Sequence, residues 1–345
     1  MAKKLLLPIL FIFSLSLTGC VHPSPKIAHH SAKPSIALVT NAPDDPSNPY
    51  ITAGKEGVKA YAQTHHLSVG KNGYQIFSPN YAKEDYSLID QAAQKNFHTI
   101  IALGASLTNA VNDTASLYPH NNFVLIDGKA KAASNVTSIT FSSWEMGYLA
   151  GVAAASSSKT HIIGILSQTK SPLTKGYEAG INYYSKHYHH KTTLLTKNIS
   201  STPNKGQTQN LTQQIYAKNA DIIFSAVGQN SNGVFSAAKS INQARPVNQK
   251  VWVIGIDNDQ SSLGNYQAKG GQPSNFTLTS VVKNIPQAIE TISEKSFNND
   301  FPARKHLTYN LKNNGISLIH SNNLSYSSWI AIQKARLQLI GQNEK

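Results

Sequence analysis

The 345-residue sequence has a single cysteine, Cys20, so a disulfide within one chain is excluded. No Gly-x-Gly-x-x-Gly turn follows the first strand-like segment and no Gly-x₄-Gly-Lys-Ser/Thr loop occurs, so a dinucleotide or triphosphate cofactor is not expected. The sequence also lacks Gly-x-Ser-x-Gly, His-Glu-x-x-His and a convincing catalytic triad. We therefore expect a protein that needs no cofactor and is not an enzyme.

Arginine is scarce, because only Arg245, Arg304 and Arg336 contribute to the 31 basic side chains. The net charge of +14 rests mostly on lysines, which are scattered along the chain and form no basic stripe. Proteins that read nucleic acids usually rely on arginine for bidentate contacts. We expect no nucleic-acid partner and interpret the positive charge as a surface facing an anionic cell envelope.

Long apolar runs are missing except at the N-terminus, where two lysines precede an apolar stretch over 5–17. That stretch is too short for a comfortable membrane span. The Leu-Thr-Gly that follows, ending at Cys20, resembles the bacterial lipobox, whose cysteine carries acyl chains. An ordinary signal peptide with an accidental cysteine is the alternative. We predict a signal peptide over 1–19, lipidation at Cys20, a flexible tether over 20–34, and a domain anchored to the outer face of the cell membrane.

The mature chain alternates short apolar strands with amphipathic helices, which predicts an α/β fold with parallel sheets covered by helices. The pattern restarts after about five strands, which indicates two arrays of similar size. In such sheets, ligands bind outside the carboxyl ends of the strands. Strands are predicted at 35–40, 74–78, 99–104, 122–128, 136–141, 161–167, 192–197, 221–227, 251–257 and 276–283. Helices are predicted at 52–64, 86–95, 107–118, 144–156, 172–187, 206–218, 233–242, 285–297 and 327–339.

Two further apolar segments lie near the C-terminus, at 306–311 and 316–319. They flank Asn313-Asn314-Gly315, which is a good signal for a tight turn. The local pattern therefore predicts a β-hairpin.

Several segments taken together resemble the basic membrane protein family, the nucleoside-binding lipoproteins of bacterial ABC transporters. The resemblance covers nearly the whole mature length and follows the family's order. The segments are SIALVT (35–40), NVTSITFSSWEMGYLAGVAAA (135–155), IGILSQTKSPLTKGYEAG (163–180), ADIIFSAVGQNSNGVFSAAK (220–239), VIGIDNDQ (253–260) and LTSVVKN (278–284).

The resemblance implies a type I periplasmic-binding-protein fold, in which two doubly wound parallel-sheet lobes are joined by a hinge. Lobe 1 is then expected over 35–140 and 277–305, and lobe 2 over 141–276 and 306–345. The family implies a nucleoside ligand, with a purine expected, and the permease of an ABC importer as partner.

The resemblance also implies site residues at the strand ends. Asp257 aligns with the family's ribose-binding aspartate, and Lys283 with a lysine near the ribose. A vicinal diol suits a carboxylate acceptor with an ammonium donor beside it. Asp127, Gly104 and Gly228 follow strands in corresponding positions, and glycine there lets a ligand approach the backbone. Each also has a plainer interpretation, as a helix cap, a turn or a solvated side chain.

The first loop departs from the family pattern. Asn41 stands where the family has an aspartate, so an amide that can donate and accept replaces a charged acceptor. Asp45 belongs to the altered Asp-Asp-x-Ser motif, and Tyr50 is our candidate for the aromatic that stacks on a base. The family's second aromatic is missing from 200–203, which weakens the expectation of a purine.

Two alternatives remain open at this stage. The run His187-Tyr188-His189-His190 offers imidazole ligands for Zn²⁺ or Cu²⁺, but it ends a predicted helix, without nearby cysteine or carboxylate, and we expect no metal site. The altered loop leaves room for a surface lipoprotein of the same fold that acts as an adhesin or sensor, or that binds a non-nucleoside ligand.

Overall fold

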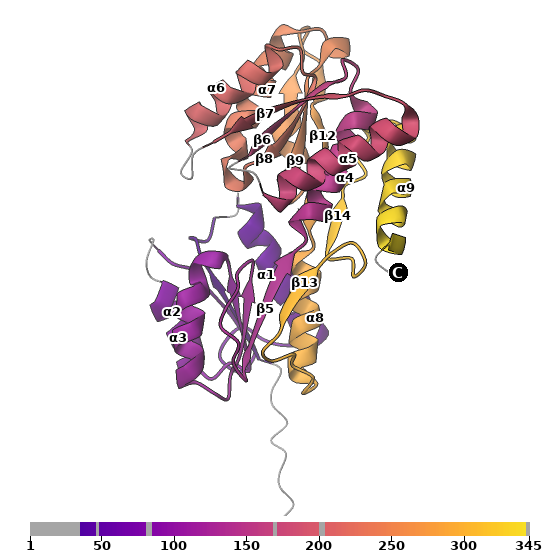
Figure 1. Cartoon of the computed structure of the whole chain (residues 1–345). Coiled ribbons are helices and arrows are strands. Elements are labelled where there is room, and N and C mark those ends of the chain that lie inside the picture. The colour runs from indigo at the N-terminus through magenta and orange to yellow at the C-terminus, as the bar shows by residue number, and fades with distance from the viewer. Residues whose placement is uncertain (1–34, 46–47, 81–84, 168–170, 200–203, 343–345) are drawn as a thin grey trace, which may run out of the picture. The chain divides into compact units, whose positions relative to one another are not determined.

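The computed structural model describes residues 35–45, 48–80, 85–167, 171–199 and 204–342. Within these ranges the chain forms two six-stranded sheets, each between two layers of helices (Figure 1). Most predicted elements are confirmed to within three residues at each end. The predicted signal peptide, Cys20, the tether and the 200–203 loop lie outside the described residues.

The first sheet has the strand order β13-β5-β4-β3-β1-β2, and every neighbouring pair is parallel. Runs of β-branched and apolar residues place β1 and β3 entirely out of solvent, as expected for a parallel sheet covered on both faces. Its strands are β1 (Ile36–Thr40), β2 (Tyr74–Phe77), β3 (Thr99–Leu103), β4 (Asn122–Ile126), β5 (Val136–Phe141) and β13 (His306–Tyr309).

The second sheet has the order β14-β12-β9-β8-β6-β7. Its pairs are parallel except that β14 runs antiparallel to β12 at the edge. A separate ribbon pairs β10 (Asn265–Gln267) with β11 (Pro273–Asn275). The strands of the second sheet are β6 (Ile162–Ser167), β7 (Thr193–Asn198), β8 (Ile222–Ala226), β9 (Trp252–Asp257), β12 (Thr277–Lys283) and β14 (Ile316–Leu318).

Helices cover both faces of each sheet (Figure 1). On the first sheet, α2 and α3 pack together on one face and α1 and α8 on the other; on the second, α6 pairs with α7, α4 with α5, and α9 lies on α4. The helices are α1 (Pro49–Thr64), α2 (Asp85–Gln94), α3 (Thr108–Leu117), α4 (Ser143–Ser157), α5 (Pro172–Tyr188), α6 (Lys205–Tyr216), α7 (Ser231–Ala244), α8 (Ile285–Phe297) and α9 (Tyr326–Gln342).

Two predicted strand assignments are wrong. Strand β12 belongs to the second sheet although it was assigned to lobe 1, and β13 belongs to the first sheet although it was assigned to lobe 2. The chain changes lobes directly after Lys283 and after Tyr309, one strand later than predicted. Strand assignment depends on pairing between distant segments, and neither apolar run carries a local mark of its sheet.

The predicted hairpin at 306–319 is also wrong. The turn does form, with the Gly315 amide donating to Asn310 O at 2.8 Å, but it joins strands of different sheets. Strand β13 pairs with β5 and β14 pairs with β12. An Asn-Gly turn sets only the local direction of the chain, whereas pairing with distant strands places β13 at the edge of the first sheet and β14 at the edge of the second.

Three chain segments therefore cross between the lobes, and hydrogen bonds connect them. Ser142 N donates to Tyr309 O at 2.8 Å, which links the first crossing to the third. Asn284 N donates to Gly315 O at 2.8 Å, which links the second to the third. Leu311 N also donates to Oε2 of the buried Glu145 at 2.8 Å. The lobe junction therefore consists of three chain segments that are hydrogen-bonded to one another, and not of a single linker.

Candidate functional site

A cavity of about 980 Å³ lies where the carboxyl ends of the two sheets meet. Residues of both lobes line it, and several follow directly on β1, β3, β4, β8 and β9. This is the place where open parallel sheets hold ligands. The cavity brings together all eight predicted site residues: Asn41, Asp45, Tyr50, Gly104, Asp127, Gly228, Asp257 and Lys283.

Four of these residues end strands with a left-handed backbone. The φ angles are 122° at Gly104, 61° at Asp127, 53° at Gly228 and 71° at Asp257. A non-glycine residue there is uncommon, and aspartate is among the side chains that tolerate it. Asp127 follows β4, and the neighbouring strand β3 is followed by Gly104. In the same way Asp257 ends β9, and Gly228 lies just after the neighbouring strand β8. The two lobes thus present the same glycine–aspartate pair to the cavity.

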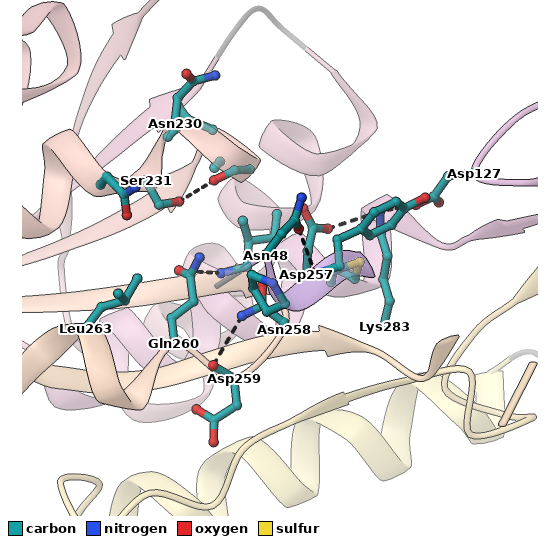
Figure 2. A pocket seen from close by; sticks show the side chains of 18 of the residues that line it. Asn48, Asp127, Asn230, Ser231, Asp257, Asn258, Asp259, Gln260, Leu263 and Lys283 are labelled. Atoms are coloured by element: carbon teal, nitrogen blue, oxygen red, sulfur yellow. Dashed lines mark hydrogen bonds and ion pairs between the residues drawn. The ribbon is translucent and has the colours of Figure 1, made fainter. Parts of the chain in front are cut away.

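Lys283 connects the two aspartates across the lobe junction. Its Nζ lies 2.9 Å from Asp127 Oδ2, on the first sheet, and 3.0 Å from Asp257 Oδ1, on the second. Figure 2 shows Asp127, Asp257 and Lys283 together at one side of the cavity. Burial alone would lower the pKa of Lys283, but the carboxylates of Asp257 and Asp127 outweigh it and raise the pKa above its ordinary value. The ammonium group therefore stays charged at neutral pH.

This trio suits a vicinal diol. The two carboxylates keep lone pairs that are not used by Lys283, and hydroxyl groups can donate to them. The three side chains are 16–26% exposed, so they are partly withdrawn from water and still reachable from the cavity. Hydrogen bonds from ligand hydroxyls to such carboxylates are charge-assisted and correspondingly strong.

Tyr50 enters the cavity from the start of α1. Asn48 caps this helix by accepting hydrogen bonds from the amides of Tyr50 and Ile51, and Pro49 occupies the first turn. The Tyr50 hydroxyl is buried, and the Asp127 carboxylate is close enough to act on it as a hydrogen-bond acceptor. Burial, and then the charge of Asp127, raise the pKa of Tyr50 well above its ordinary value, so the phenol remains a neutral donor. Tyr50 lines the cavity, so its ring is available to a ligand beside the Asp127 carboxylate.

Asn41 lies at the end of β1, beside Gly104. A methyl group added to Gly104 would stand 2.4 Å from Asn41 Nδ2, so the close approach as well as the φ angle requires glycine there. Asn41 Oδ1 is buried and has no hydrogen-bond partner among the described residues. In the strand order, β1 is two strands from β4, which places Asn41 about 10 Å from Asp127 along the sheet edge. That distance is comparable to the length of a nucleoside.

Sequence reasoning missed the polar residues that lobe 2 contributes around the start of α7. Asn230, Ser231 and Asn232 line the cavity there, and Asn258, Asp259 and Ser262 line it after β9. Figure 2 shows Asn230, Ser231, Asn258 and Asp259 among the lining residues. The signal was present, because the first residues of a helix that follows a strand-end glycine face the crevice. Asp259 in particular follows Asp257 by two residues, and only the structure shows that both reach the cavity.

The histidine run lies at the end of α5 and does not line the cavity. His187 packs against Tyr183 with a ring-centroid distance of 4.1 Å, and His190 packs against His161 at 5.1 Å, with the rings tilted in both pairs. No group of three or more His, Cys, Asp or Glu arranged for a metal ion occurs in the described ranges. The histidines are exposed at the helix end and contact neighbouring aromatic rings.

The comparisons identify the family. The family model described as "ABC transporter substrate-binding protein PnrA-like" matches residues 35–341. The chain belongs to this family. This agrees with the resemblance to the basic membrane proteins, and the family is one of substrate-binding proteins and not of enzymes.

Among curated relatives, the ABC transporter nucleoside-binding protein BmpA of Lactococcus lactis subsp. cremoris is 34% identical over 88% of this chain and 86% of its own length. Basic membrane protein D of Borreliella burgdorferi is 27% identical over 72% of this chain and 69% of its own. A solute-binding protein of an ABC transporter system from Aeropyrum pernix K1 has the same fold, with a TM-score of 0.70 at 16% identity over 90% of this chain and 92% of its own. The type I periplasmic-binding-protein fold is thereby confirmed.

This substrate-binding protein acts outside the cytoplasm, as its family does. Within the described ranges no helix is both long and apolar enough to cross a membrane.

Proposed function

We propose that this PnrA-like protein captures a nucleoside, with a purine as the expected base, and delivers it to an ABC importer. The observation that carries the proposal is the Asp127–Lys283–Asp257 trio, which unites both lobes beside an aromatic side chain in one cavity. Membership in a family that includes a nucleoside-binding relative supports it.

In this proposal each site residue has a role. The ribose diol bonds to Asp127 and Asp257, and Lys283 fixes both carboxylates. The base stacks on Tyr50, while its polar edge meets Asn41 and Asp45 at the far end of the sheet edge. Gly104 and Gly228 let the ligand lie against the backbone. A stacked base and a charge-assisted diol contribute about 1–3 kcal/mol each, which is compatible with tight binding in a preformed site.

Transport then uses the lobe junction. A ligand that contacts both lobes favours the closed arrangement, and a permease that recognises the closed arrangement receives only loaded protein. Cys20, once lipidated, holds the domain to the outer face of the membrane near that permease. Metabolic labelling with a radioactive fatty acid tests this anchor: the wild-type chain should carry label, and Cys20→Ala should not.

Calorimetric titration of the mature domain tests the ligand. Protein should first be unfolded and refolded to remove any bound molecule, and then titrated with adenosine, guanosine, inosine, cytidine and uridine. We expect micromolar or tighter binding of at least one purine nucleoside, without its breakdown. Ligand-free protein that binds none of the five would contradict the proposal, and hydrolysis of the nucleoside would show an enzyme instead.

A further inference from the structure

The cavity has the opposite charge from the chain that surrounds it. Four carboxylates line it, those of Asp45, Asp127, Asp257 and Asp259, against the single ammonium group of Lys283. Among the described lining residues the formal charge is therefore four negative and one positive, or −3, in a chain whose net charge is +14. An acidic cavity in a basic protein favours neutral and cationic ligands over anionic ones.

We propose that the cavity selects its ligand by charge, admitting neutral and cationic nucleosides and excluding nucleotides. This inference rests on the proposed nucleoside function and goes beyond it, because it states which charged derivatives are accepted. Cationic nucleosides, such as those with an amino group on the sugar, form the additional substrate class.

Size does not provide this selection. At about 980 Å³ the cavity lies at the upper end of the range for small-molecule sites, with ample room for a phosphate group beside a nucleoside. In this arrangement of the lobes size does not exclude a nucleotide, so the charge of the lining is the feature that can exclude it.

Lys283 does not offset the negative charge for a phosphate. Its ammonium group is held between two carboxylates at 2.9 and 3.0 Å. To reach a phosphate it would have to leave at least one of them, and that carboxylate would remain unpaired next to the incoming anion. The trio as a unit carries one net negative charge.

Helix N-termini are the feature that opposes this inference. The first turns of α1, α4, α5 and α7 contribute Tyr50, Ser143, Leu173 and Ser231 to the lining, and each helix carries a partial positive charge at that end. At about half an elementary charge each, four helices supply about +2. The sum with −3 remains negative, so the dipoles moderate the field and do not reverse it.

The test compares ligands that differ only in charge. Calorimetry at pH 7 should measure adenosine, its 5′- and 3′-monophosphates, and 5′-amino-5′-deoxyadenosine against the mature domain; if another nucleoside binds best, its equivalents are used. We expect both phosphates to bind at least about 100-fold more weakly than the nucleoside, and the amino derivative to bind as tightly or more tightly. Using both phosphate positions makes the result independent of ligand orientation. The discrimination should shrink as salt is raised, because exposed charges are screened.

Variants locate the cause. Asp259→Asn and Asp127→Asn should each lower the ratio of nucleotide to nucleoside dissociation constants several-fold, whatever they do to nucleoside binding itself. Asp300→Asn, which removes an exposed carboxylate paired with Lys295 outside the cavity, should leave the ratio unchanged. A nucleotide that binds as tightly as the nucleoside, or a ratio that both cavity variants leave unchanged, would overturn the charge rule while the nucleoside function stands. Failure of every nucleoside to bind would instead overturn the proposed function.

Discussion

The two lobes have the same frame and place different chemistry on it. When the strand orders are matched, β4 corresponds to β9, β3 to β8 and β5 to β12. The glycine–aspartate pair is therefore repeated, as Gly104 with Asp127 and as Gly228 with Asp257. At the next strand end the lobes differ, because β5 ends in the buried Phe141 and β12 ends in Lys283.

This difference determines how the lobes meet. Two equivalent aspartates that face one cavity would repel each other, and one lysine from lobe 2 pairs with both. The same ammonium group lies 5.8 Å from the centre of the Phe141 ring, its counterpart in lobe 1. Through a single unmatched residue the repeated frame thus joins both lobes at one cavity, to which lobe 1 contributes the aromatic Tyr50.

Removing the unmatched lysine should have the largest effect. Lys283→Met leaves Asp127 and Asp257 partly buried without a cation, and we expect a loss of about 3 kcal/mol or more in the free energy of nucleoside binding. Denaturant unfolding should also show a lower free energy of unfolding. Lys295→Met, which breaks only the exposed pair with Asp300, is the matched control and should change neither quantity by more than about 0.5 kcal/mol. Equal effects of the two variants would contradict the central role of Lys283.

The second comparison concerns helix packing behind the sheets. In lobe 2, α4 and α5 touch through glycines, so that a methyl group on Gly180 would stand 2.1 Å from Tyr148 O. In lobe 1 the corresponding pair is α1 and α8, where a methyl group on Gly57 would stand 2.8 Å from Pro286 Cα. We expect Gly180→Ala to lower the free energy of unfolding by about 3 kcal/mol and Gly57→Ala by about 1 kcal/mol. Urea denaturation measures both losses. A larger loss for Gly57→Ala than for Gly180→Ala would show that the α1–α8 contact tolerates an added methyl group less well than the α4–α5 contact.

Substituting Asp127 and Asp257 one at a time tests whether the two equivalent aspartates contribute equally to ligand binding. Asp257→Ala should weaken nucleoside binding at least tenfold, since it removes a charge-assisted hydrogen bond of about 1.5–3 kcal/mol. Asp127→Ala should have a similar effect if the diol lies between the two carboxylates. Calorimetry decides, and a large effect of Asp257 with none of Asp127 would assign the ribose to lobe 2 alone. Unchanged affinity in both variants would refute the diol assignment.

Local sequence patterns predicted most of what lies within each lobe. Apolar runs located the strands of the two main arrays, most clearly the central ones such as β1, β3 and β8, because a strand buried on both faces is apolar almost throughout. The strand-end positions of Asp127, Asp257 and Lys283 followed from the same runs. The family resemblance added their expected roles, and the structure then placed them in one cavity.

The relations between the lobes could not be predicted in this way. The segments 277–283 and 306–309 carry no local mark of their sheet, because the sheet that each one joins is set by pairing with a distant strand, β9 for the first and β5 for the second. To predict that Lys283 pairs with both aspartates, one would have to know that the ends of β4, β9 and β12 meet. Asp127 and Lys283 are 156 positions apart in the sequence, so no local pattern shows this. Asp259 was missed for a local reason, because the sequence does not show that the loop after β9 keeps it at the cavity beside Asp257.

Tyr50 is the aromatic side chain that lobe 1 contributes to the cavity and lobe 2 does not match, and substituting it measures that contribution. Tyr50→Leu keeps an apolar side chain but removes the ring, and we expect nucleoside binding to weaken by about 1.5 kcal/mol, or roughly tenfold. Tyr50→Phe keeps the ring and removes only the hydroxyl, so it should retain most of the affinity. Calorimetry of both variants separates stacking from hydrogen bonding. A loss that is larger for Phe than for Leu would mean that the hydroxyl, and not the ring face, binds the ligand.

The smallest expected effect is that of pH on the trio. A lysine whose pKa is raised on folding contributes stability that is fully present below its ordinary value of 10.5 and is lost only as the pH rises through the folded value. The difference in free energy of unfolding between wild type and Lys283→Met should therefore stay constant between pH 6 and 9, because the contributions of the histidines cancel in that difference. Above pH 10 this difference should shrink, whereas the contribution of Tyr50, whose pKa is also raised, largely cancels because both proteins contain it. Urea unfolding across this range measures it, and a difference that falls already between pH 6 and 9 would show that Lys283 is not held in its charged form by the two carboxylates.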